Sequence, residues 1–115
     1  MHRSFSALPI ILSLAVLLAA CGAGDPAITL EKIQLDLGDV PNGQVIVRDV
    51  EIRNDGDAVL LVEGVSTSCG CTSATVEPLE LAPGEGGTLH IELDSGAHGP
   101  ELTGPLVRQV FIQSN

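Results

Sequence analysis

Cys69 and Cys71, separated only by Gly70, are the residues of this sequence whose type and spacing could do chemistry. Gly70 lets the backbone bend, so the two Cα atoms can approach the ~5.5 Å that a disulfide prefers. Three hypotheses remain open. We favour a structural disulfide or buried pair, and the alternatives are a redox-labile pair and a soft-metal site for Cu(I) or zinc. No Lys, Arg or His lies within several residues to stabilise a thiolate, which weakens the redox hypothesis.

Histidines supply no obvious partner for these thiols. Zinc would need two further ligands, and neither His90 nor His98 lies at a familiar spacing from the cysteines. His90 falls on the polar face of a predicted strand and His98 in a Gly/Pro loop, so we expect both to be solvated. The sequence has no nucleophile elbow, phosphate loop, His-Glu-x-x-His pair or paired-carboxylate motif. We therefore predict no enzymatic activity, no catalytic residue, no metal site and no cofactor.

The third cysteine, Cys21, ends a segment that resembles a bacterial lipoprotein signal. A short positively charged start is followed by an apolar run from Leu8, and Leu18-Ala19-Ala20 precedes the cysteine. The run of about 13 residues is shorter than the roughly 20 that a membrane-spanning helix needs. The resemblance implies that residues 1–20 are a removed signal peptide and that Cys21 is the lipid attachment site, carrying diacylglycerol and an acyl chain such as palmitate. We expect a lipid anchor on the extracytoplasmic side of a cell-envelope membrane.

The remaining chain is strongly acidic. Residues 21–115 hold four basic residues against fifteen acidic ones, a formal charge of −11 with neutral histidines. Such a surface repels nucleic acid and anionic headgroups, so we expect no nucleic-acid partner. Trp and Tyr are missing from the sequence, and Phe111 is the one Phe after the signal, so the core must be aliphatic.

Residues 21–27 are rich in Gly and predict a flexible tether, and residues 28–115 predict one domain. Apolar residues recur there with the period of two that is typical of strands. The predicted strands include Ile33 to Leu37, a strand of two phases around residues 45–52 with a bulge near residues 48–49, Leu60 to Val65, Leu89 to Leu93 and Val107 to Gln113. Turns are predicted at residues 38–43, 54–57 and 83–87, and a loop at residues 95–105. After the signal, no segment has the apolar stripe of a helix.

Five short motifs carry a resemblance to domain-of-unknown-function family 1573 over about residues 30–115. They are Leu35-Asp36-Leu37-Gly38-Asp39-Val40, Asn54-Asp55-Gly56, Ser68-Cys69-Gly70-Cys71-Thr72, Leu81-Ala82-Pro83-Gly84-Glu85 and Gln113-Ser114-Asn115. The family is similar to immunoglobulin-like domains of the major-sperm-protein, Hydin and ASPM type. The resemblance implies an all-β, immunoglobulin-like antiparallel sandwich that lacks its last strand, because family members continue past the Ser-Asn.

Together these features predict a lipid-anchored envelope protein that acts as a non-catalytic interaction or scaffolding module. Its partners would be the membrane, through the lipid, and a protein that the sequence does not identify. The alternative is a small redox or soft-metal-handling lipoprotein that uses Cys69 and Cys71.

Overall fold

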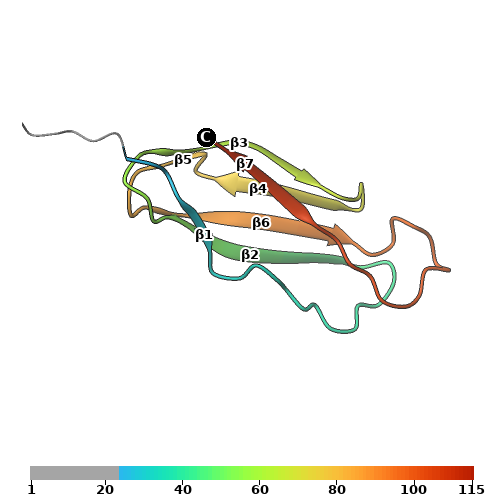
Figure 1. Ribbon diagram of the computed structural model, residues 1–115. Helices are drawn as coiled ribbons and strands as arrows, with labels where there is room; N and C mark the ends of the chain where they lie inside the picture. The colour runs from blue at the N-terminus through green and yellow to red at the C-terminus, as the bar shows by residue number, and fades with distance from the viewer. Residues whose placement is uncertain (1–23) are drawn as a thin grey trace, which may run out of the picture.

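The computed structural model describes residues 24–115, which form seven strands and no helix (Figure 1). The strands are β1 (Ile28–Leu30), β2 (Val45–Asn54), β3 (Leu60–Thr67), β4 (Thr72–Glu77), β5 (Glu80–Leu81), β6 (Gly86–Asp94) and β7 (Val110–Ser114). They form a four-stranded sheet in the order β1-β2-β6-β4 and a three-stranded sheet in the order β5-β3-β7, with antiparallel pairing throughout. The predicted all-β sandwich is thus confirmed. No helix within the described range is long and apolar enough to span a membrane.

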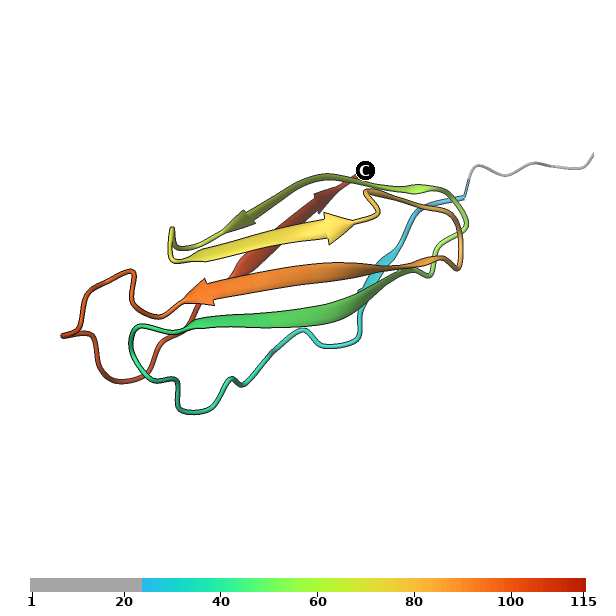
Figure 2. The same cartoon turned by 180° about the vertical axis from the view of Figure 1, so that it is seen from behind.

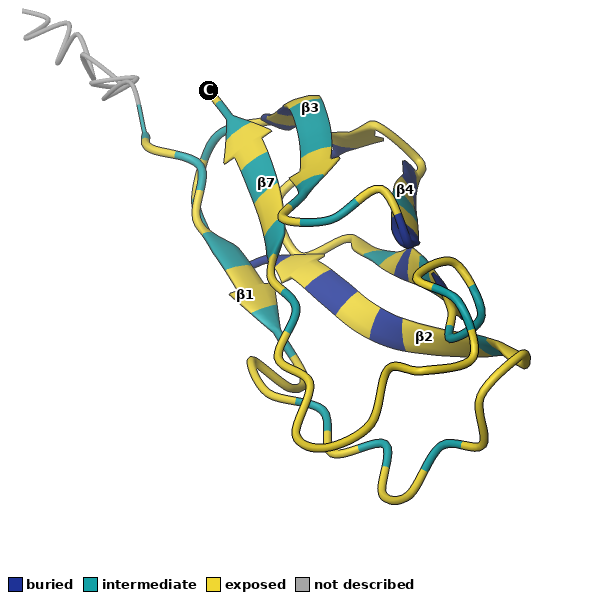
Figure 3. Cartoon of the chain, turned by 90° about the vertical axis from the view of Figure 1, so that its right-hand side faces the viewer, coloured by how far each residue is buried: buried dark blue, intermediate teal, exposed yellow. Residues whose placement is uncertain are grey.

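Aliphatic side chains from the facing sides of the two sheets form the core. From Asp49 to Asn54, the second half of β2, exposed and buried residues alternate with the period of a strand (Figure 3). The buried cluster consists of Val50, Ile52, Leu60, Val62, Val76, Leu81 and Leu89. Full burial of one such side chain stabilises the fold by about 1.5–3 kcal/mol relative to an exposed one. Phe111 is 48% exposed, so the core formed by residues 24–115 is aliphatic, as expected.

The predicted bulge near residues 48–49 is wrong. The ladder between β2 and β6 runs without a shift from Val45↔Asp94 to Arg53↔Gly86. Val45 and Val47 simply lie on the outer face, where single exposed apolar side chains are common. The register shift lies in β3 instead, between Val62 and Gly64.

Two predicted strands differ from the structure. The predicted strand from Ile33 to Leu37 is absent from the described chain, since residues 31–44 are irregular and Ile33 is 93% exposed. The first strand lies earlier, at Ile28–Leu30. Leu35 still packs against the core, so the alternation reflected partial burial rather than a sheet ladder. The last strand begins at Val110 rather than Val107. The short strands β4 and β5 were not predicted.

The side chain of Asn54 links several segments at one end of the sandwich. Its side chain is fully buried, and Nδ2 donates to the carbonyl oxygens of Ala58 (2.7 Å) and Leu81 (2.9 Å). Oδ1 accepts hydrogen bonds from the amides of Ala27 (3.2 Å) and Gly56 (3.0 Å). The oxygen and the nitrogen of this side-chain amide both have hydrogen-bond partners, as burial requires. Asn54 therefore joins the predicted turn at residues 54–57 to β5 and to the segment before β1.

Candidate functional site

The Cys-Gly-Cys element lies where the chain passes from one sheet to the other. Residues 68–71 connect β3 of the three-stranded sheet to β4 of the four-stranded sheet. The single proton of the Thr67 hydroxyl lies within donating distance of two carbonyl oxygens, those of Cys69 (2.9 Å) and Thr72 (2.8 Å), and the Thr72 amide donates to Cys69 O at 3.2 Å. Figures 1 and 2 show this connection at the same end of the sandwich as the loop that follows β6.

Cys69 and Cys71 are joined in a disulfide, with their Cα atoms 5.2 Å apart. This is the bond favoured from the sequence. The two cysteines differ in exposure, because Cys71 is buried (5% exposed) while Cys69 is partly exposed. The Cys71 amide donates to Cys69 Sγ at 3.1 Å. A reagent arriving from solvent therefore meets the Cys69 sulfur first.

His98 lies beside the more exposed sulfur. Its Nε2 is 3.1 Å from Cys69 Sγ, although 29 residues separate the two in sequence. The loop around it is fixed on both sides, since Ser95 Oγ donates to Pro41 O (2.8 Å) and Asn42 Nδ2 donates to Gly99 O (2.9 Å). His98 is exposed in a loop, as predicted, but its imidazole also contacts Cys69, which the sequence did not predict.

Arg108 contacts the buried sulfur. Its Nε donates to Cys71 Sγ at 3.3 Å across a separation of 37 residues. Two hydrogen bonds of 2.9 Å hold the neighbouring segment in place, from the Ser68 amide to Gln109 O and from the Gln109 amide to Ser68 Oγ. Within residues 24–115, no carboxylate forms an ion pair with Arg108, whereas Arg53 lies within ion-pair distance of two.

These contacts change what the cysteine pair can do. A disulfide sulfur is a weak, neutral acceptor, whereas a thiolate is charged and gains more from a cationic donor. The Arg108 guanidinium beside Cys71 therefore favours the reduced pair relative to a disulfide without such a neighbour. From the sequence, His98 was set aside as a ligand because of its spacing and Arg108 was not singled out, since no local pattern places residues 29 and 37 positions away beside the cysteines. The predicted lipid site, Cys21, lies outside the described residues.

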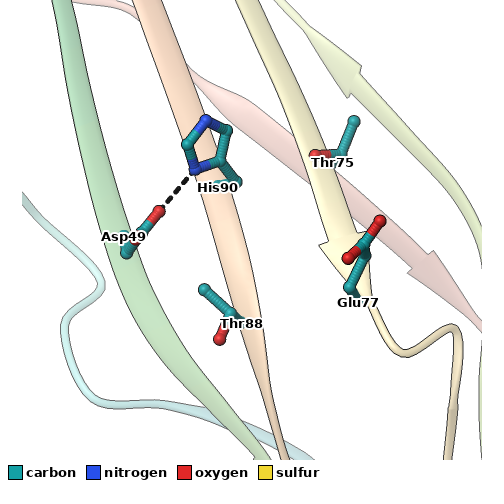
Figure 4. Close-up of a pocket in the computed structure, with 5 residues that line it drawn as sticks. All are labelled: Asp49, Thr75, Glu77, Thr88 and His90. Atoms are coloured by element: carbon teal, nitrogen blue, oxygen red, sulfur yellow. Dashed lines mark hydrogen bonds and ion pairs between the residues drawn. The ribbon is translucent and has the colours of Figure 1, made fainter.

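His90 belongs to a different surface. It is exposed, as predicted, and lies opposite Asp49 on β2, with Nδ1 2.6 Å from Asp49 Oδ1 (Figure 4). Thr75, Glu77 and Thr88 complete the lining of an open hollow on the outer face of the four-stranded sheet. Among these described side chains, the Asp49 to His90 contact is the one hydrogen bond, so no hydroxyl is joined to the imidazole as a nucleophile would be.

The comparisons with known proteins concern the fold and the family. The domain is similar to a protein of unknown function from Porphyromonas gingivalis W83, known from its crystal structure, with a TM-score of 0.55 and 29% sequence identity. The similarity covers 60% of this chain but only 30% of that one, so the chain spans less than a third of its structural relative. No curated protein matches the sequence. Neither result points to a catalytic activity.

The family model described as "Protein of unknown function (DUF1573)" matches residues 28–115. This match covers the whole β-sandwich, from its first strand to its last, and confirms the resemblance that the sequence motifs indicated. The chain therefore belongs to the DUF1573 family.

Proposed function

We propose that the Cys69–Cys71 disulfide is reversible and that the protein exchanges it with the thiols of a partner dithiol protein. One observation carries this proposal. Arg108 Nε lies 3.3 Å from the sulfur of the buried cysteine, Cys71, which is the sulfur that would leave as a thiolate. Thiol–disulfide exchange is faster when the leaving thiolate is stabilised.

The exchange begins at the exposed side of the bond. A partner thiolate attacks Cys69 Sγ, the bond between Cys69 and Cys71 breaks, and its electron pair leaves on Cys71 Sγ. Arg108 Nε–H and the Thr72 hydroxyl, 3.6 Å from that sulfur, stabilise the new thiolate. The second partner thiolate then attacks the partner sulfur of the mixed disulfide and releases Cys69. Two electrons pass to the cysteine pair, two protons from the partner thiols reach it through water, and the partner leaves as a disulfide.

The site acts at the extracytoplasmic side of a cell-envelope membrane, to which the lipid on Cys21 attaches the domain. The signal-like residues 1–20 and the small residues before Cys21 support this location. A disulfide also fits such a compartment, because cytosolic reductants keep thiols reduced. The acidic surface disfavours nucleic acid and leaves a protein as the expected partner.

Two single-cysteine variants test the proposal in the full chain carrying Cys21→Ser. Cys71→Ser leaves the partly exposed Cys69, and Cys69→Ser leaves the buried Cys71. With glutathione disulfide as the probe, we expect Cys69 to form the mixed disulfide at least tenfold faster than Cys71, measured by intact mass. Equal rates, or faster reaction at Cys71, would contradict the proposed direction of attack.

A non-catalytic interaction or scaffolding role is the second candidate. It is favoured by the open edge of the three-stranded sheet, since β7 pairs only with β3 among the described strands. In that case the disulfide is purely structural and has a reduction potential below about −300 mV. A wild-type bond that resists dithiothreitol until the domain unfolds would support this second role and refute the first.

A further inference from the structure

Three potential metal ligands meet at the end of the sandwich. The sulfur atoms of Cys69 and Cys71 and a ring nitrogen of His98 all lie within 4.8 Å of one another. They come from the connection between β3 and β4 and from the loop after β6, which separate hydrogen bonds hold in place. When the imidazole carries its proton on Nδ1, the lone pair of Nε2 faces the sulfur atoms. Reduction of the disulfide would leave two thiolates and this nitrogen around one point.

The type and number of these ligands select the metal. Thiolates are soft ligands that suit Cu(I), and imidazole also suits copper. Structural zinc is almost always bound by four ligands in a tetrahedron, whereas within residues 24–115 this cluster has three. The hard cations Ca²⁺ and Mg²⁺ require oxygen ligands, which the cluster lacks. A soft ion that accepts low coordination fits best.

Charge points to the same ion. Cu(I) bound by two thiolates and a neutral imidazole carries one net negative charge, which the Arg108 guanidinium beside Cys71 would balance. Zn²⁺ in the same site would be neutral and would leave the arginine charge uncompensated close to a buried sulfur. Arg108 therefore favours a monovalent over a divalent ion here.

We propose that the reduced protein binds one Cu(I) ion through Cys69, Cys71 and His98. This inference rests on the proposed reversibility of the disulfide, because the same two sulfur atoms form either the S–S bond or the metal bonds. Metal binding and oxidation then exclude each other. Oxidation of the pair by a disulfide of a partner protein transfers two electrons to that partner, forms the Cys69–Cys71 bond and releases Cu(I).

The test is an anaerobic titration of the full chain, carrying Cys21→Ser, with Cu(I) in competition with a coloured Cu(I) chelator. We expect one Cu(I) per reduced chain and none in the disulfide form. His98→Ala should lower the Cu(I) affinity by on the order of 10- to 100-fold, because even the loss of a residue that only supports a metal ligand has effects of this size. The matched control is His90→Ala, on the outer face of the four-stranded sheet beside Asp49. It should leave the Cu(I) affinity unchanged.

The outcomes separate this inference from the proposed function. A pair that thiols reduce reversibly but that binds no Cu(I) refutes the metal site alone. Equal Cu(I) affinity in His98→Ala and the wild type refutes the third ligand, and retention of stoichiometric zinc against Cu(I) refutes the choice of metal. A disulfide that thiols reduce only in the unfolded chain refutes both proposals.

Discussion

Replacing Arg108 with Gln should make the Cys69–Cys71 disulfide harder to reduce. The substitution removes the charged guanidinium and leaves a shorter, neutral polar side chain. In the oxidised protein, Nε donates to a neutral sulfur at 3.3 Å, an interaction of about 0.5–1.5 kcal/mol. In the reduced protein it would donate to a thiolate, and hydrogen bonds to charged groups contribute about 1.5–3 kcal/mol. The reduced form therefore loses about 1–1.5 kcal/mol more than the oxidised form.

This difference converts to a measurable potential. For a two-electron couple, 30 mV corresponds to about 1.4 kcal/mol, so the midpoint should fall by about 20–30 mV. The sign follows because the variant destabilises the reduced form. The assay equilibrates the chain, carrying Cys21→Ser, in dithiothreitol redox buffers at mildly alkaline pH, traps free thiols by alkylation and counts them by mass.

Arg48→Gln is the matched control, since it removes the same charge from an exposed side chain whose Nη1 donates to the neighbouring carbonyl of Val47. It corrects for the change in net charge. If Arg108→Gln shifts the potential no more than Arg48→Gln does, or shifts it upwards, the assignment of Arg108 to the leaving thiolate is wrong.

Three further changes test the core, the buried amide and the anchor. Leu89→Ala should lower the free energy of unfolding by about 2–5 kcal/mol because it leaves a cavity in the core, while His90→Ala on the outer face should cost little. Urea unfolding measures both losses, and similar values would mean that the strand faces are assigned wrongly. Asn54→Ala should cost about 2–4 kcal/mol in the same assay because it strips buried backbone groups of their partners, and a loss below 1 kcal/mol, roughly one average hydrogen bond, would contradict that role. Cys21→Ser should prevent lipid attachment, since only a thiol accepts the diacylglycerol; detergent partitioning of the expressed protein checks this, and a variant of normal processed size in the detergent phase would contradict the lipoprotein hypothesis.

The core could be predicted from the sequence where alternation was clean. Leu89 and Leu93 are buried and His90 is exposed, as the predicted strand requires, but Ile91 is only partly buried. Alternation tells which residues share a face, but not whether that face has a second sheet over it along its whole length. For the same reason Val45 and Val47 suggested a bulge, although they lie on the outer face of a regular strand.

The sequence by itself determined the all-β class and the aliphatic core and favoured a bond between Cys69 and Cys71, because each depends on residues close together in the chain, and the structure then showed that bond. Residue type, a period of two and one intervening glycine are local properties. Only the tertiary structure decided which side chains surround the disulfide. His98 and Arg108 reach it from 29 and 37 residues away because two sheets stack and their connections meet at one end. Local sequence preferences do not specify this proximity, because it depends on the order of the strands in the sheets and on the hydrogen bonds that hold the loops in place.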